Sequence, residues 1–238
     1  VGTANLVRAA ADAACRRLVA ESFVGVYGAG SPGGVLEEEG PLPPLPAGPL
    51  RDSVAALRSL EEQLQTARRE GWIEAVALRI GVLHGGEVAS TIALRDRLRA
   101  RRMAVPLGPP GRMSFVDVDD AAGAVVAALE TPAPGPTYNV ADDEPTAFGE
   151  YVDLAAEVFG APRPPRVPAW LMRPFAPVLV AGASLTLPLS NARAKAELGW
   201  RPFRSTPRLA LERAAGATGG ARAPSAMGES GRGEGRTG

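Results

Sequence analysis

The sequence contains few residues that could transfer a proton during a redox reaction. Hydride chemistry that relies on a tyrosine needs an ammonium group one helical turn away, so Tyr-x-x-x-Lys must share one helix face. The tyrosines are Tyr27, Tyr138 and Tyr151, and the residues four positions later are serine, aspartate and alanine. Lys195 is the only lysine in the chain. The sequence therefore predicts that a tyrosine–lysine pair is absent.

Other reaction types are also poorly supported by the residue types. A serine hydrolase would need His84, the only histidine, as its base, and neither Ser22 nor Ser53 stands in the sharp G-x-S-x-G turn. One histidine and one cysteine disfavour a zinc site. We expect the lone cysteine, Cys15, to be buried in a helix as a small apolar residue.

Two strands joined by a helix would position the remaining polar residues. Residues 17–21 and 72–80 form short apolar runs that end at Ser22 and Gly81, which predicts two parallel strands. The helix between them, residues 52–69, should be capped by Asp52 or Ser53 and should place Glu61 and Glu62 outside. Ligands bind where parallel strands leave the sheet, so Ser22 marks a candidate site. Arg79, near the end of a buried strand, needs a carboxylate partner such as Asp120.

The later part of the chain predicts further strands at residues 114–118 and 137–140, and helices at 89–102, 121–130, 147–159, 170–180 and 191–198. Asp119 or Asp120 is expected to cap the helix at 121–130. Beyond residue 215 the sequence has no apolar periodicity, which predicts a disordered tail.

The glycines at positions 28, 30 and 33 fit the dinucleotide pattern G-x-G-x-x-G after a strand. A phosphate-binding turn must open a helix, whereas here Pro32, three glutamates and a proline-rich stretch follow. We therefore interpret residues 28–33 as a mobile loop, or a lid over the site.

Composition and charge narrow the class of protein. Lys and Arg number 26, as do Asp and Glu, so no net positive field favours nucleic acid or an anionic membrane. The most apolar region, residues 169–189, is interrupted by Arg173, Pro174 and Pro177, which disfavours a membrane helix. We expect a soluble, cytoplasmic protein.

Seven short motifs occur in an order that resembles the NAD-dependent epimerase/dehydratase family, the extended short-chain dehydrogenases. In chain order they are Gly2-Thr3-Ala4-Asn5-Leu6-Val7, Arg17-Leu18-Val19 to Ser22, Val26-Tyr27-Gly28, Leu78-Arg79-Ile80-Gly81, Ser114-Phe115-Val116-Asp117-Val118-Asp119-Asp120-Ala121-Ala122, Tyr138-Asn139-Val140-Ala141-Asp142-Asp143-Glu144-Pro145 and Leu198-Gly199-Trp200-Arg201-Pro202. Each motif alone is weak, but their shared order over residues 2–202 is specific.

The resemblance implies an α/β fold. It would comprise the rear half of a Rossmann-like parallel sheet, residues 1–83 and 121–141, and a smaller C-terminal substrate lobe, residues 84–120 and 142–215, followed by the tail at 216–238. The family's glycine-rich first half would precede Val1, so the chain is expected to be a fragment. The resemblance also implies NAD or NADP as cofactor, a sugar nucleotide or related small molecule as substrate, and a homodimer through the helices at residues 1–14 and 52–69.

The resemblance also assigns residues to the site. Cofactor contacts fall on Ser22, Phe23, Gly81, Val82, Leu83 and His84, and the candidate catalytic residues are Ser22, Tyr27 and Ser53. A substrate-phosphate arginine of the family falls on Met113, which leaves Arg112 as the candidate.

This sequence differs from the family at the positions of the family's catalytic residues. Phe23 stands where the family has a catalytic serine or threonine. Aligning Glu61 with the family's glutamate places Ser53 and Leu57 at the tyrosine and lysine, whereas Glu62 would place Val54 and Arg58 there. We expect an NAD(P)-binding protein whose redox or epimerase activity is altered, weakened or lost. The alternative is a non-catalytic nucleotide-sensing or scaffold protein on the same fold.

Overall fold

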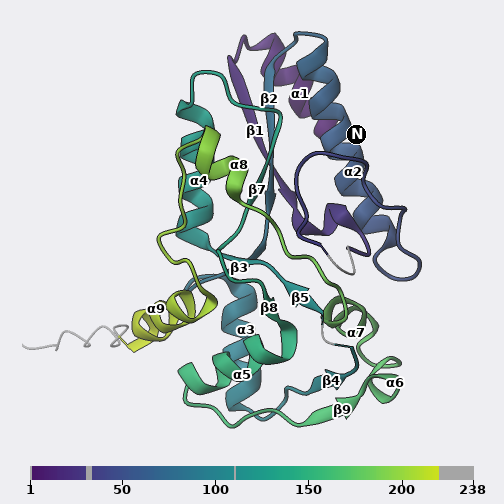
Figure 1. Ribbon diagram of the computed structural model, residues 1–238, viewed down its shortest axis with the longest axis vertical. Helices are drawn as coiled ribbons and strands as arrows, with labels where there is room; N and C mark the ends of the chain where they lie inside the picture. Colours follow the sequence, from purple (N-terminus) through teal and green to yellow (C-terminus); the bar gives the residue numbers. More distant parts are fainter. Residues whose placement is uncertain (1, 31–33, 110, 220–238) are drawn as a thin grey trace, which may run out of the picture.

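A three-stranded parallel sheet forms the centre of the computed structural model, which describes residues 2–30, 34–109 and 111–219 (Figure 1). Its strands are β1 (Arg17–Phe23), β2 (Glu74–Ile80) and β7 (Thr137–Val140), in the order β1-β2-β7. Both strand pairs are parallel. The expected α/β fold with a parallel sheet is confirmed.

Helices cover both faces of this sheet because alternate residues of β2 point to opposite sides. Ala75 and Ala77 pack with residues of α1 (Gly2–Asp12) and α2 (Arg51–Arg69). Val76, Leu78 and Ile80 pack on the other face, against α4 (Val118–Glu130) and the segment around α8 (Ala192–Glu197). In Figure 1, α1 and α2 accordingly lie on one side of the strands and α4 and α8 on the other.

A second group of elements lies beyond the carboxyl ends of the strands, in the lower half of Figure 1. Its strands form three small pairs: β3 (Val82–His84) with β6 (Phe115–Asp117), β4 (Val105–Leu107) with β9 (Arg166–Pro168), and β5 (Arg112–Met113) with β8 (Thr146–Ala147). Its helices are α3 (Ala89–Arg99), α5 (Phe148–Val158), α6 (Ala169–Met172), α7 (Pro177–Ala183) and α9 (Pro207–Gly219). A 3-10 turn, η1 (Val24–Tyr27), follows β1.

Several local expectations are wrong. Cys15 is exposed after the end of α1 rather than buried in a helix. The cap of α4 is Asp117, whose side chain accepts the Asp119 amide, because the helix begins three residues earlier than expected. The apolar stretch at 170–180 is split into α6 and α7. Helix α9 continues to Gly219, past the expected start of the tail, and residues 220–238 lie outside the described residues.

No helix in the described ranges has the length and apolar character needed to cross a bilayer.

Candidate functional site

Three polar side chains lie side by side near the carboxyl ends of the central strands. The strand register pairs Ser22 of β1 with Arg79 of β2, and Arg79 with Asn139 of β7. All three residues are buried. Because neighbouring strands are about 4.8 Å apart, paired residues on one face are within reach of shared partners.

Helix α2 supplies the carboxylate, that of Glu61, which accepts hydrogen bonds from Ser22 and Arg79. The Arg79 Nη2 and Nε atoms donate to Glu61 Oε2 at 2.7 Å and Glu61 Oε1 at 3.0 Å, and Ser22 Oγ donates to Oε1 at 2.6 Å. Glu61 is 3% exposed. The expectation that Glu61 faces outward is wrong. The expected carboxylate partner of Arg79 is present, and it is Glu61 rather than Asp120.

Tyr27 extends the hydrogen-bonded group of Ser22, Glu61 and Arg79, which is called the network below. Arg79 Nη1 donates to the Tyr27 hydroxyl at 2.8 Å, and that hydroxyl lies 2.9 Å from both Asn139 Oδ1 and the Glu37 carbonyl oxygen. Asn139 Nδ2 donates to the Leu36 carbonyl oxygen at 3.0 Å. Burial raises the pKa of the Tyr27 phenol above its ordinary value despite the nearby guanidinium, so the phenol stays protonated at neutral pH.

These contacts determine what the expected catalytic residues can do. Ser22 and Tyr27 are brought into one network, but both hydroxyls are enclosed and hydrogen-bonded within it. Ser53 is separate from the network and is exposed in the first turn of α2. A direct role of these three side chains in chemistry stays a prediction.

An apolar wall stands beside the network at the end of β1. A methyl group placed on Gly25 would lie 3.0 Å from the Phe23 ring and 3.5 Å from Leu57 Cδ1, so these two side chains both pack closely against Gly25. Phe23 is 37% exposed, and Leu57 is half-buried. The wall suits one face of a flat, weakly polar ring, such as the nicotinamide of a dinucleotide, and offers no ligand for a phosphate.

A cavity of about 480 Å³ begins where β2 gives way to β3. Val82 and Leu83, two of the expected cofactor-contacting residues, line it together with residues of α3, α5 and α7. Gly81 lies just before them, and a side chain there would approach the Ser114 carbonyl oxygen at 2.8 Å. Glycine at this position therefore permits the close approach of the chain to β6.

His84 lies beneath this cavity rather than in its wall. Its ring is fully buried, with its centroid 5.6 Å from that of Phe115 and 5.9 Å from that of Tyr151. Neither ring nitrogen has a hydrogen-bond partner among the described residues, and burial lowers the pKa of His84 to about 4. In this conformation the imidazole is neutral at pH 7 and has no surface open to a cofactor.

Arg112, the candidate substrate ligand, is exposed and donates to the Pro145 carbonyl oxygen. The adjacent Met113, rather than Arg112, lines the 480 Å³ cavity.

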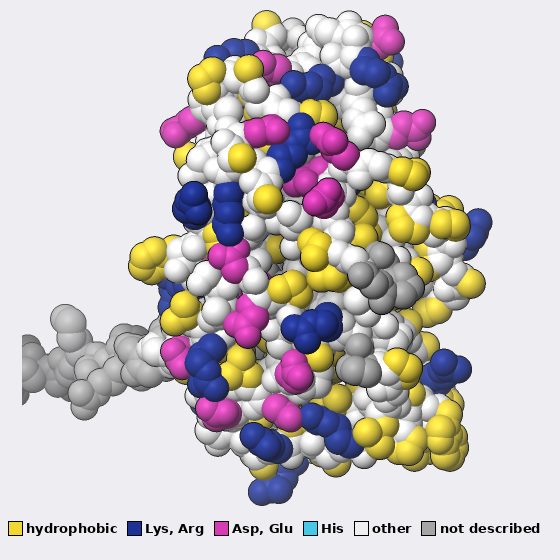
Figure 2. Space-filling model, in the orientation of Figure 1, with side chains coloured by type: hydrophobic (Ala, Val, Ile, Leu, Met, Phe, Trp, Pro, Cys, Tyr) yellow, Lys and Arg dark blue, Asp and Glu magenta, His cyan; other side chains and the backbone are white. Residues whose placement is uncertain are grey.

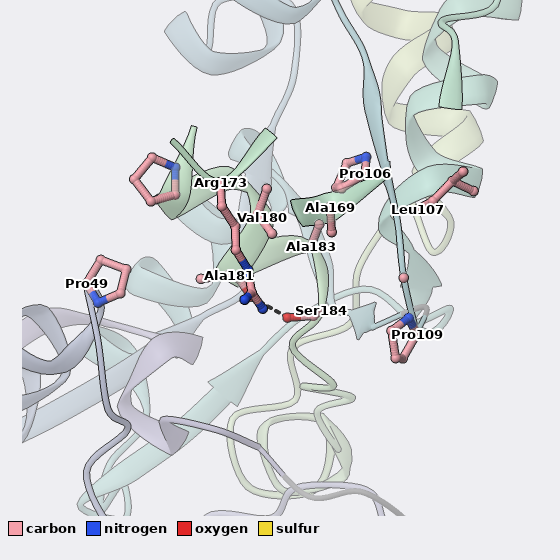
Figure 3. A pocket seen from close by; sticks show the side chains of 12 residues that line it. Pro49, Pro106, Leu107, Pro109, Ala169, Arg173, Val180, Ala181, Ala183 and Ser184 are labelled. Atoms are coloured by element: carbon pink, nitrogen blue, oxygen red, sulfur yellow. Dashed lines mark hydrogen bonds between the residues drawn. The ribbon is translucent and has the colours of Figure 1, made fainter. Parts of the chain in front are cut away.

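A second cavity, of about 330 Å³, lies on the other side of α7 (Figure 3). Prolines and short aliphatic side chains form most of its wall, and Arg173 reaches into it toward Ser184. Val180 and Ala181 of α7 line this cavity, whereas Val178, Leu179 and Gly182 line the larger one. The helix therefore separates two apolar spaces.

Sequence reasoning missed Glu61 and Asn139 as members of the site. A signal for Glu61 exists, because positions 54, 57, 61 and 64 follow the 3-4-3 spacing of one helix face. A glutamate on that apolar face must find a buried partner. No local pattern identifies Asn139, whose role depends on the alignment of β7 with β2.

With this arrangement of strands, helices and lobe, the sequence matches the NAD dependent epimerase/dehydratase family over residues 1–141, and the chain belongs to that family. A Streptomyces protein described as a 3-diazoavenalumate denitrifying reductase is 38% identical over 215 residues. That match covers 84% of this chain and 66% of the relative, so the chain spans just under two thirds of the relative's length.

Solved structures show the same fold. A conserved protein of unknown function from Silicibacter pomeroyi has a TM-score of 0.74 and 28% identity, with 90% of this chain and 72% of that chain covered. The UDP-glucose 4-epimerase of Thermotoga maritima, solved with UDP-glucose, has a TM-score of 0.72 and 19% identity, with 91% and 68% covered.

Proposed function

We propose that this chain is part of a nicotinamide-dependent reductase that acts on a small molecule without a tyrosine–lysine proton donor. The observation that carries the proposal is the inward position of Glu61 in its ion pair with Arg79. It favours the alignment in which Glu61 is the family's glutamate and disfavours Glu62, which is exposed. Ser53 and Leu57 then occupy the positions of the proton-transferring pair.

The residues at the strand exit suit the nicotinamide end of NAD or NADP. Phe23 and Leu57 would contact one face of the ring, and Val82 would border it from the end of β2. The Ser22–Glu61–Arg79–Tyr27 network would hold β1, β2 and α2 in place beneath this wall. None of its hydroxyls is open to a substrate, so the network orients the site and does not transfer the proton.

The Streptomyces relative suggests a reaction that needs no proton donor. When bound, the reduced cofactor would supply a hydride ion, which can replace a diazonium group on carbon while N₂ leaves with the electrons of the broken C–N bond. This exchange balances in atoms and charge without a proton, which fits a site with Phe23, Ser53 and Leu57 at the positions of the usual acid–base groups. A sugar nucleotide, expected from the wider family, is the competing substrate class.

Titration with NADH and NADPH, followed by nicotinamide fluorescence, tests the cofactor claim. We expect saturable binding to a reductase that includes this chain and the family's glycine-rich first half, weakened about tenfold by Phe23→Ala, because the variant removes the exposed ring at the strand exit. Trp72→Ala is the control, since this exposed aromatic residue lies at the opposite end of β2. Absence of a saturable change at millimolar NADH and NADPH would contradict the proposal.

A nucleotide sensor or scaffold, the second candidate, is favoured by the enclosure of Ser22 and Tyr27. The two candidates differ in turnover. A reductase that includes this chain consumes NADH or NADPH when a diazo arene carboxylate is added and releases N₂, whereas a sensor binds the nucleotide without consuming it.

A further inference from the structure

We propose that the 480 Å³ cavity between α3, α5 and α7 binds a flat aromatic carboxylate rather than a sugar nucleotide. This cavity is called the aromatic pocket below. The inference rests on the proposed function, because it names the substrate class of that same site. It depends on the shape and charge of the cavity wall, which are properties of this chain.

Apolar side chains form most of the wall of the aromatic pocket. The Phe115 and Tyr151 rings are stacked, with centroids 4.0 Å apart and planes inclined by 15°. The other apolar residues of the wall are Val82, Leu83, Ala93, Leu94, Met103, Met113, Phe148, Val178, Leu179 and Ala183. Such a wall favours a flat hydrophobic ligand, and methionines adapt well to an aromatic ring.

The volume fits a single compact molecule. Small-molecule sites commonly measure roughly 300–1,000 Å³, and this pocket lies in the lower part of that range. A nucleotide diphosphate sugar would have to place a base, a ribose, two phosphates and a hexose. A predominantly apolar wall would leave the hydroxyls and phosphates of such a ligand without partners.

The charge of the wall indicates one anionic group on the ligand. Arg97 is the only charged residue among those described that line the pocket, and it is exposed on α3. No carboxylate within residues 2–30, 34–109 and 111–219 forms an ion pair with it, whereas the nearby Arg95 pairs with Asp96 at 2.9 Å. An arginine fork matches one carboxylate in a bidentate geometry, while a diphosphate calls for more cationic groups.

The position of the pocket connects it to the proposed redox site. Val82 follows β2 by two residues and lies at the start of the pocket wall, directly after the strand exit. A ring held between α3 and α7 would therefore approach the nicotinamide side of the site from the substrate lobe.

Calorimetric titration of this chain with 4-hydroxycinnamate and with UDP-glucose provides the first test. We expect saturable binding of 4-hydroxycinnamate and no competition from UDP-glucose. The neutral analogue 4-hydroxycinnamyl alcohol should bind about tenfold more weakly, because it lacks the charge that Arg97 would meet. Competition by UDP-glucose, or no binding of 4-hydroxycinnamate, would overturn the proposal.

Variants of α7 locate the binding site. A side chain added at Gly182 meets nothing within 4 Å, so Gly182→Leu should fill the aromatic pocket without a backbone clash and abolish binding. Ala181→Leu is the matched control, because it adds bulk one residue away but on the side of the 330 Å³ cavity. Unchanged binding by Gly182→Leu, or loss only in Ala181→Leu, would place the ligand elsewhere.

Variants of α3 test the carboxylate contact. We expect Arg97→Gln to weaken binding of 4-hydroxycinnamate about tenfold and to leave the neutral alcohol unaffected, while Arg95→Gln changes neither. Equal loss for both ligands would contradict a charge contact. Circular dichroism of each variant identifies any that fails to fold, and the ligand comparison on the unmodified chain remains decisive in that case. Failure of NADH binding with intact 4-hydroxycinnamate binding would reject the reductase and retain the pocket.

Discussion

At the level of single residues, the Glu61–Arg79 pair dominates the candidate site. Both side chains are almost fully removed from water, and their attraction must offset the loss of hydration of two charges. The Ser22 and Tyr27 hydroxyls supply further hydrogen bonds to the pair. Such a pair holds its neighbours in one arrangement, but removal of either charge leaves the other buried and unpaired.

We expect Glu61→Gln to lower the free energy of unfolding by about 3 kcal/mol, because the Arg79 charge then lacks a counter-ion in the interior. Urea denaturation followed by circular dichroism measures this loss. Glu62→Gln, on the exposed side of the same helix, should change stability by less than about 0.5 kcal/mol. Equal effects of the two substitutions would show that Glu61 does not carry the proposed structural role.

At the level of secondary-structure elements, α4 anchors the segment that precedes α9. The Asp120 carboxylate accepts the backbone amides of Phe203 at 3.1 Å and Arg204 at 2.8 Å, and its carbonyl oxygen accepts the Trp200 indole N–H at 2.9 Å. This residue therefore joins a helix of the sheet layer to the C-terminal part of the chain. Trp170, Phe175 and Val178 are exposed in and between helices α6 and α7, and yellow side chains gather over this region in Figure 2.

Asp120→Ala should release the amides of Phe203 and Arg204, because no other side chain among the described residues accepts them. We expect faster hydrogen exchange at these two amides and a stability loss of about 1–3 kcal/mol. Exchange followed by mass spectrometry provides the measurement. Asp119→Ala is the control, since its half-exposed carboxylate forms surface ion pairs with arginines instead. Unchanged protection in Asp120→Ala would contradict the anchoring role.

At the level of the whole molecule, two buried titratable groups affect stability in opposite directions as pH changes. Burial lowers the pKa of His84 to about 4, so the unfolded chain binds the extra proton between about pH 6.5 and 4 and stability falls as the solution is acidified. Burial raises the pKa of Asp142 to about 8, with the nearby Asp143 and Glu144 charges adding to the effect. The folded chain then keeps a proton that the unfolded chain has lost, so stability falls as pH rises from 3.8 toward 8.

Between pH 6.5 and 8 the effect of Asp142 on stability outweighs that of His84, because the His84 imidazole is neutral in the folded chain and at most half protonated in the unfolded chain. We expect a stability loss of about 1–2 kcal/mol over this interval and little loss in Asp142→Asn, which carries no ionisable proton. Urea denaturation at several pH values measures the slope. Asp143→Asn should retain most of this pH dependence of stability, since burial is the main cause of the raised Asp142 pKa and Asp143 itself is paired with Lys195. A stability that stays constant in the unmodified chain would contradict this account.

A homodimer through α1 and α2 stays a prediction at this scale.

From the sequence alone, most of the elements and a candidate position for the site could be predicted. Apolar runs and helix periodicity predicted β1, α2, β2 and β7 to within a few residues, and the ends of parallel strands indicated the region around Ser22. The spacing of the tyrosines and the single lysine predict that a tyrosine–lysine pair is absent, which stays a prediction. These properties are local, so they can be read from neighbouring residues along the chain.

Only the tertiary structure decided the partners of the buried charges. Arg79 and Glu61 are 18 residues apart, and Tyr27 and Asn139 are 112 apart, so their contacts depend on strand register and on the rotation of α2. The enclosure of His84 and the apolar wall of the pocket likewise arise where α3, α5 and β6 meet. Burial and pairing are properties of this packing, because they depend on which surfaces exclude water rather than on residue type alone.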